Sequence, residues 1–77
     1  MSNHGFELGT HLRMMRKASG LTLKQVTKQT GISFTFLSDV ETGRACPSFP
    51  TLQKLADCYG QTITISFVPS DWSNYEI

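Results

Sequence analysis

The chain has 77 residues, enough for one small domain but too few for a second hydrophobic core or a deep active-site cleft. Hydrophobic residues make up 39% and charged residues 17%, as in ordinary globular proteins, and no apolar run approaches the roughly 20 residues that span a membrane. The net charge is only +1, but all seven cationic side chains lie between residues 11 and 54, where two acids oppose them, so a nucleic-acid partner is not excluded.

The first ten residues contain neither a basic region nor an apolar stretch, so we expect no secretory signal and a cytoplasmic protein. Cys46 and Cys58 have no neighbouring His or Cys at metal-ligand spacing. Reduced, structural thiols are therefore predicted, with no metal and no cofactor.

An enzymatic function is not expected. His4, Glu7 and His11 could share one helix face by their spacing, yet no base, nucleophile and oxyanion donor converge in the sequence. Exposed histidines near a frayed N-terminus are the preferred interpretation.

The first two predicted helices are separated by a glycine. Residues 7–19 carry apolar side chains at spacings of three and four, and Gly20 ends this helix. Thr22 and Gln25 then have the spacing of a capping box, in which each side chain satisfies the other residue's backbone N–H. This box predicts a second helix over residues 23–30.

A tight turn separates the second helix from the third. Gly31 ends one and Ser33 begins the next over residues 34–42, so the chain must change direction sharply. Ser48 caps a fourth helix that extends to about Tyr59. Two short helices joined by a glycine-containing turn predict a helix-turn-helix, whose second helix enters a DNA major groove.

After Gly60 the hydrophobic period changes from helical to two. Ile63, Ile65 and Phe67 share one face of a predicted strand over residues 61–68. A lone strand leaves its backbone groups unpaired, so we expect it to pair with the same strand of a second copy across a two-fold axis. The alternative is a strand folded onto the first or fourth helix of its own chain.

Residues 69–77 form a short acidic tail. A flexible end is the default interpretation. Trp72 and Tyr75 are nevertheless more aromatic side chains than a solvated tail needs, so they are candidate contacts to a neighbouring subunit or a protein partner.

A set of positions spread over residues 8–60 fixes the helix caps, the turn glycine and the core together. In chain order they are Arg16, Gly20-Leu21-Thr22, Val26, Gly31-Ile32-Ser33, Leu37, Glu41-x-Gly43, Pro47-Ser48 and Leu52-x-x-Leu55-Ala56. The pattern resembles the Cro/phage-repressor type of helix-turn-helix, often called the XRE family. The resemblance implies a mainly α, lambda-repressor-like domain of four to five helices over residues 1–60, followed by the dimerisation strand.

The same resemblance implies the roles of individual residues. In the family, the positions of Arg16 and Glu41 form a partly buried ion pair between the first helix and the end of the third. The expected base contacts are Leu23, Ser33, Phe34, Thr35 and Asp39. The expected phosphate contacts are Thr22, Lys24, Lys28, Arg44 and Ser48.

Some positions depart from the family pattern. Leu23 stands where the family commonly has Gln, so any readout there is apolar or absent. Thr27 stands where a small residue is expected at the contact between the helices. Phe36 is expected to pack against the second or fourth helix, with insertion near DNA as the alternative.

These observations predict a sequence-specific transcriptional repressor that binds double-stranded DNA as a homodimer on a near-palindromic operator. The alternative is an antitoxin that binds a cognate toxin protein and represses its own operon, because a one-domain repressor with a C-terminal dimerisation strand is similar to such antitoxins. A pure protein-interaction module would differ from both, since its binding would not weaken linearly with the logarithm of salt concentration.

Overall fold

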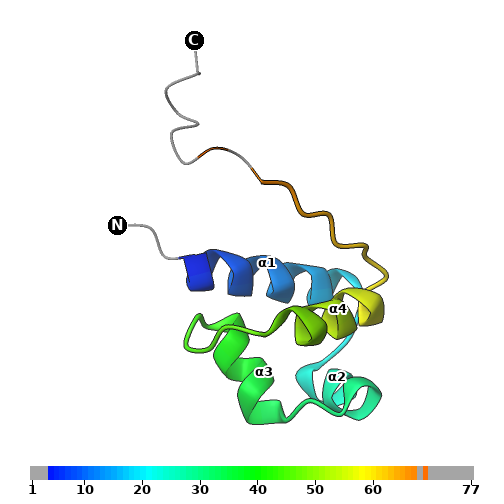
Figure 1. The fold of residues 1–77 in the computed structure, drawn as a ribbon. Helices are drawn as coiled ribbons and strands as arrows, with labels where there is room; N and C mark the ends of the chain where they lie inside the picture. The colour runs from blue at the N-terminus through cyan, green and yellow to red at the C-terminus, as the bar shows by residue number, and fades with distance from the viewer. Residues whose placement is uncertain (1–3, 68, 70–77) are drawn as a thin grey trace.

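The computed structural model describes residues 4–67 and 69, with side chains from residue 7 onward, and this part of the chain contains four helices (Figure 1). They are α1 (His4–Ala18), α2 (Leu23–Thr30), α3 (Phe34–Glu41) and α4 (Phe49–Cys58). The mainly helical prediction is confirmed. The second helix has its predicted bounds, and the others differ by a few residues at their ends, where helices fray. None of the described helices is long and apolar enough to be a membrane span.

Hydroxyl side chains start three of the four helices. Thr22 accepts a hydrogen bond from the Gln25 N–H at 3.1 Å, and the Thr22 N–H donates to the Gln25 side chain at 2.8 Å, which completes the predicted capping box. Ser33 and Ser48 cap α3 and α4 in the same way. At the other end of α3, Thr42 is the C-cap and not part of the helix.

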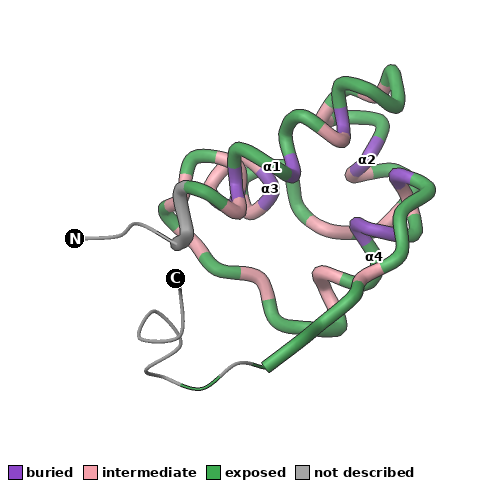
Figure 2. Tube along the Cα trace, turned by 90° about the horizontal axis from the view of Figure 1, so that it is seen from above, coloured by how far each residue is buried: buried purple, intermediate pink, exposed green. Residues whose placement is uncertain are grey.

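The core lies where the four helices meet. α3 packs against α1 and α2, and α2 also packs against α4. The buried side chains come from every helix and from the end of α4: Leu12, Val26, Leu37, Val40, Leu55, Ala56 and Tyr59. Figure 2 shows these buried positions on the inward sides of the helices. The spacing of apolar residues therefore identified the inner faces correctly.

Gly9 lies where α1 approaches the backbone of α3. A Cβ atom at this position would lie 2.7 Å from the carbonyl oxygen of Glu41 and still closer to that of Val40. Both obstacles are backbone atoms, so α1 and α3 can pack at this distance only with glycine. Glycine within a helix lowers helix stability relative to alanine, and this contact gives Gly9 a packing reason.

The segment after Gly60, residues 61–67, is called the arm below. The predicted strand is not confirmed: the arm has no strand pairing within the described chain, and Val68 lies outside the described residues. The physical reason is that a strand needs a hydrogen-bonding partner, and residues 4–67 supply none.

The first half of the arm lies beside α1 and α4. Residues 61–64 line a groove together with α1 and α4, and Ile63 is half-buried there, which matches part of the alternative prediction. Ile65 and Phe67, on the same predicted face, are 55% and 94% exposed. The predicted partner contacts Trp72 and Tyr75 lie outside the described residues, as do all of residues 70–77.

Candidate nucleic-acid interface

α2 and α3 are joined by a turn of three residues, Gly31, Ile32 and Ser33. Gly31 has a φ angle of 78°, in the left-handed region that a side chain disfavours, and its N–H donates to the Thr27 carbonyl at 2.9 Å. This residue ends α2 and turns the chain sharply into α3. The arrangement in Figure 1 is therefore the predicted helix-turn-helix.

The N-terminal turn of α3 presents several predicted base contacts to solvent. The Ser33 hydroxyl oxygen accepts from the Phe36 N–H at 3.1 Å, which leaves its O–H free to donate elsewhere. Phe34 is 51% exposed and Thr35 is also exposed. An apolar ring, a methyl group and two hydroxyl groups are thus available on one short surface, and these groups suit the thymine methyl and the polar edges of bases.

Asp39 is half-buried in the middle of α3. Its carbonyl oxygen accepts from the backbone N–H groups of Arg44 at 2.8 Å and Ala45 at 3.1 Å. These bonds tie the loop after α3 back onto the helix. The backbone carbonyl of Asp39 therefore has a structural role, in addition to the DNA contact predicted for its carboxylate. It fixes the position of Arg44 in the loop after α3.

Leu23 does not stand free at the start of α2. It is half-buried and packs against the core cluster. Much of its side chain is thus occupied by packing, which gives a physical reason for leucine where the family commonly has glutamine. The predicted apolar readout at Leu23 is limited to the part of the side chain that remains accessible.

The predicted phosphate contacts are all at the surface. Thr22, Lys24, Lys28, Arg44 and Ser48 are exposed. Thr22 and Ser48 cap the N-termini of α2 and α4, where unpaired N–H groups and the helix dipole favour an anion. The set therefore combines cationic side chains with two helix N-termini.

Arg16 and Glu41 form the expected ion pair. The Arg16 Nε donates to Glu41 Oε2 at 2.7 Å, and the Nη2 donates to Oε1 at 3.0 Å. The Arg16 Nη1 also donates to the Leu21 carbonyl at 2.8 Å, so the guanidinium links α1, the loop before α2 and the end of α3. The side chains are only 10% and 7% exposed. The hydrogen bonds to Glu41 raise the pKa of Arg16, and the pair is bidentate, the strong geometry for these groups.

Two further positions pack between the helices. Phe36 is half-buried and packs against the core cluster, which favours the packing interpretation over insertion near DNA. Thr27 is also half-buried, and its hydroxyl oxygen is buried without a hydrogen-bond partner in the described part of the chain. Burial of the Thr27 hydroxyl without a partner therefore lowers the stability of the fold, at a position where the family has a small residue.

Three residues beside the helix-turn-helix were not among the predicted contacts. Arg13, Ser38 and Thr42 line a hollow between α1, α2 and α3, next to Leu23 and the ion pair. The spacing of Ser38 in α3 and Thr42 at its C-cap was available in the sequence. The position of Arg13 was not, because it depends on how α1 crosses α3.

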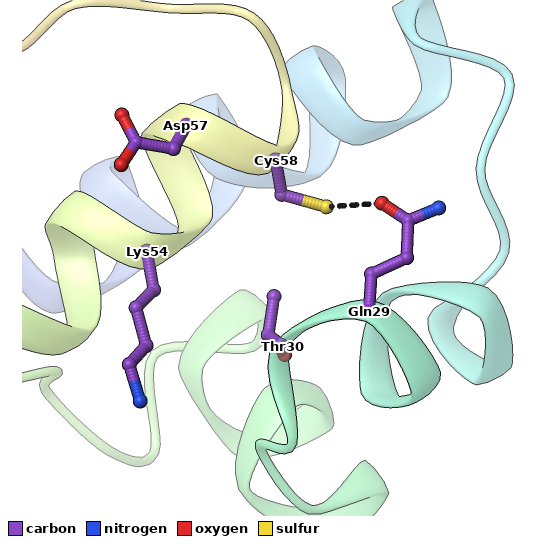
Figure 3. A pocket seen from close by; sticks show the side chains of 5 residues that line it. All are labelled: Gln29, Thr30, Lys54, Asp57 and Cys58. Atoms are coloured by element: carbon purple, nitrogen blue, oxygen red, sulfur yellow. Dashed lines mark hydrogen bonds between the residues drawn. The ribbon is translucent and has the colours of Figure 1, made fainter.

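A second hollow lies between the C-terminal ends of α2 and α4 (Figure 3). There the Cys58 thiol donates to the Gln29 side-chain oxygen at 3.2 Å, while Lys54 and Asp57 point away from this contact. Burial raises the pKa of Cys58, so the thiol stays protonated at neutral pH. Cys46 and Cys58 are both free thiols, as predicted. The Cys58 contact thus links α2 and α4 with one weak hydrogen bond.

Comparisons with known proteins agree with this geometry. The profile of the helix-turn-helix domain family matches residues 7–64. The chain is 46% identical over 57 residues to the HTH-type transcriptional regulator DdrOP3 of Deinococcus deserti, covering 74% of this chain and 44% of the relative. It is 33% identical over 64 residues to the uncharacterized HTH-type transcriptional regulator y4dJ of Sinorhizobium fredii, covering 83% of each chain.

A phage protein and a solved structure extend these comparisons. The ImmF control region 10 kDa protein of Bacillus phage phi105 is 40% identical over 52 residues, which is 68% of this chain and 58% of that protein. The crystal structure of the clp gene regulator ClgR from C. glutamicum superposes with a TM-score of 0.72 at 29% identity, covering 75% of this chain and 74% of that one. This chain thus spans less than half the length of DdrOP3, and the family match over residues 7–64 includes α2, α3, α4 and most of α1.

Proposed function

Because the chain belongs to the helix-turn-helix domain family of DNA-binding transcriptional regulators, we propose that it represses transcription as a homodimer on a near-palindromic operator. Each copy inserts the N-terminal half of α3 into a major groove. The two grooves lie about one helical turn, or about 34 Å, apart. The single observation that carries the proposal is the exposed N-terminal surface of α3, held in place by the buried Arg16–Glu41 pair.

The chemistry of this surface supports sequence-specific binding. Thr35 can donate to a base edge or place its methyl against a thymine methyl, and Phe34 can make apolar contact with thymine. Asp39 can accept from a cytosine amine and disfavours a base that presents an acceptor at the same place. Exposed cations on both sides, among them Lys24 and Arg44, set affinity and register through phosphates.

The arm supports the homodimer. Ile65 and Phe67 are large apolar side chains left in solvent by the single chain, and backbone groups beside them have no strand partner in the described residues. Pairing two arms across a two-fold axis satisfies both needs at once. The same axis relates the two copies of α3, which matches a near-palindromic operator.

Selection of bound duplexes from a random pool tests the proposed function. We expect one enriched near-palindromic site. Thr35→Ala should relax the preference at a single base pair of each half-site, because one contact is worth about 1–3 kcal/mol of discrimination. Thr10→Ala, an exposed threonine in α1, provides a control that should leave the preference unchanged. Uniform enrichment without a site would contradict sequence-specific repression.

A further inference from the structure

An apolar groove, called the arm groove below, lies between α1, α4 and the first half of the arm. Leu8 and Met15 of α1, Leu52 of α4 and Ile63 of the arm line it, and all four are half-buried. We propose that Phe67 of a second copy packs in this groove beside Ile63, with the two arms paired about a two-fold axis at Ile65. This inference rests on the proposed homodimer and names the contact that each copy supplies to the other.

The chemistry of the arm groove suits an aromatic ring. No Asp, Glu, Lys or Arg belongs to its lining in the described part of the chain, and its half-buried side chains keep apolar surface in contact with water. A neighbouring hollow between α4 and the arm is lined instead by Gln53, Asp57 and Thr62, together with Ala56 and Ile63. An apolar group therefore gains more by entering the arm groove than by entering the polar hollow beside it.

The alternation of the arm selects one pairing register. Two identical antiparallel strands related by a two-fold axis have one residue opposite itself at the centre. A centre at Ile65 places Ile63 opposite Phe67 of the second copy, so every apolar residue of this face meets an apolar partner. A centre one residue away would place Phe67 opposite Gln61, or Ile63 opposite Pro69. Opposite residues have Cβ atoms about 4.5–5.5 Å apart, which brings the second copy's ring to the arm groove.

The chain's own Phe67 is poorly placed to fill the groove. It is 94% exposed and follows Ile63 by four residues, which is about 13 Å of extended chain. A reversal between them would have to use Thr64, Ile65 and Ser66, of which two are β-branched and none is glycine or proline. Residues 61–67 also carry no Asp, Glu, Lys or Arg, so two arms can meet without repulsion between charges. A second copy is therefore the occupant that the arm favours.

Sedimentation equilibrium of two charge variants and of their equimolar mixture tests this contact. Ile63→Asp and Phe67→Lys should each raise the dissociation constant of the dimer more than about a hundredfold, because each homodimer loses both aromatic contacts. In the mixture, a heterodimer pairs the new carboxylate with the new ammonium group at one end and keeps the wild-type contact at the other. The mixture should therefore dimerise at least about tenfold more tightly than either variant alone.

Ile65→Lys is the matched control. It places the same charge on the same apolar face and should also be monomeric, but position 65 lies opposite itself in the proposed register. Its mixture with Ile63→Asp should therefore stay monomeric. Restoration of the dimer by Ile65→Lys instead of Phe67→Lys would overturn the proposed contact by shifting the register. Restoration by neither would overturn it in favour of another occupant of the groove, such as the chain's own tail or a different protein.

Circular dichroism confirms that each variant is folded. If Ile63→Asp does not fold, His11→Asp takes its place, because His11 also lines the arm groove but is exposed. Its mixture with Phe67→Lys should again dimerise more tightly than either variant alone. A dimeric Phe67→Lys protein that still selects a near-palindromic site would overturn the contact and leave the proposed repressor intact. A wild-type protein that neither dimerises nor selects such a site would overturn both.

Discussion

The four-helix part of the chain and the arm that follows it differ in what holds their residues in place. In the helices, the caps, the core and the ion pair all come from one chain. In the arm, the alternation of apolar and polar residues is as regular, yet Phe67 is 94% exposed and no strand forms in the described residues. A helix satisfies its backbone internally, whereas a strand needs a second one.

The two regions therefore have different proposed roles, one in contacting DNA and the other in assembly. The helical part holds the proposed base-contact surface in place with residues of one chain, but one short helix contacts too few base pairs to select a site. In the proposed homodimer, the arm supplies the apolar surface on which the second copy pairs. Variants of the helical part should therefore change stability, and variants of the arm should change assembly.

Arg16→Ala should have the largest effect on the helical part. It leaves the Glu41 carboxylate buried without its partner, which costs about 3–5 kcal/mol of unfolding free energy. Urea unfolding followed by circular dichroism measures this loss. Arg13→Ala is the control, since it removes an exposed arginine from the same helix and should cost less than about 0.5 kcal/mol. An unchanged midpoint for Arg16→Ala would refute the bracing role of the pair.

Gly9→Ala should be the next most damaging change. The added methyl group meets the backbone carbonyls of Val40 and Glu41, so α1 must move away from α3. We expect a loss of about 1–3 kcal/mol, as for other overpacked positions, despite the better helix propensity of alanine. Thermal unfolding measures this loss. Thr10→Ala, at an exposed neighbouring position, should be nearly neutral in the same experiment. A stabilised Gly9→Ala protein would show that the two helices are not in close contact.

Alkaline pH should weaken the core through Tyr59. Burial, with a further contribution from the charge of Glu41, raises the pKa of Tyr59 to about 12. The unfolded value is about 10, so the folded state retains a proton that the unfolded state loses. Its contribution to stability is complete below pH 10 and falls by about 2 kcal/mol as the pH rises to 12. Tyr59→Phe should flatten this part of the pH profile, and a profile identical to wild type would contradict the assignment.

Thr27→Ala should produce a small gain. It removes a buried hydroxyl that has no hydrogen-bond partner among the described residues, and alanine also favours the helix. We expect about 1 kcal/mol of added stability, seen as a higher Tm. Thr27→Val keeps the shape of the side chain and removes the same hydroxyl. It therefore separates the free-energy cost of burying the hydroxyl from the effect of changing the side-chain volume. Destabilisation by both substitutions would mean that the hydroxyl has a partner.

The sequence was sufficient to predict most of the helical part because its determinants are local. The capping box of Thr22 and Gln25, the turn at Gly31 and the cap at Ser33 depend on residues within a few positions of one another. The Arg16–Glu41 pair spans a longer distance, and the family resemblance supplied it.

The remaining features depend on how the helices cross, which local patterns do not specify. The contact of Gly9 with α3, the position of Arg13 beside Ser38 and the partial burial of Leu23 all follow from the packing of α1 against α3 and the start of α2. The predicted strand is not confirmed, because the described residues offer it no hydrogen-bonding partner. Its period of two leaves an apolar face that the proposed homodimer would cover.

Sedimentation equilibrium of wild type, Phe67→Asp and Ser66→Asp tests the division between the two regions most directly. The two substitutions add the same charge at adjacent exposed positions of the arm, but only Phe67 lies on its apolar face. The account predicts a dimeric wild type, a dimeric Ser66→Asp protein and a monomeric Phe67→Asp protein that keeps its helical circular dichroism. A Phe67→Asp protein with the same mass as wild type would contradict it.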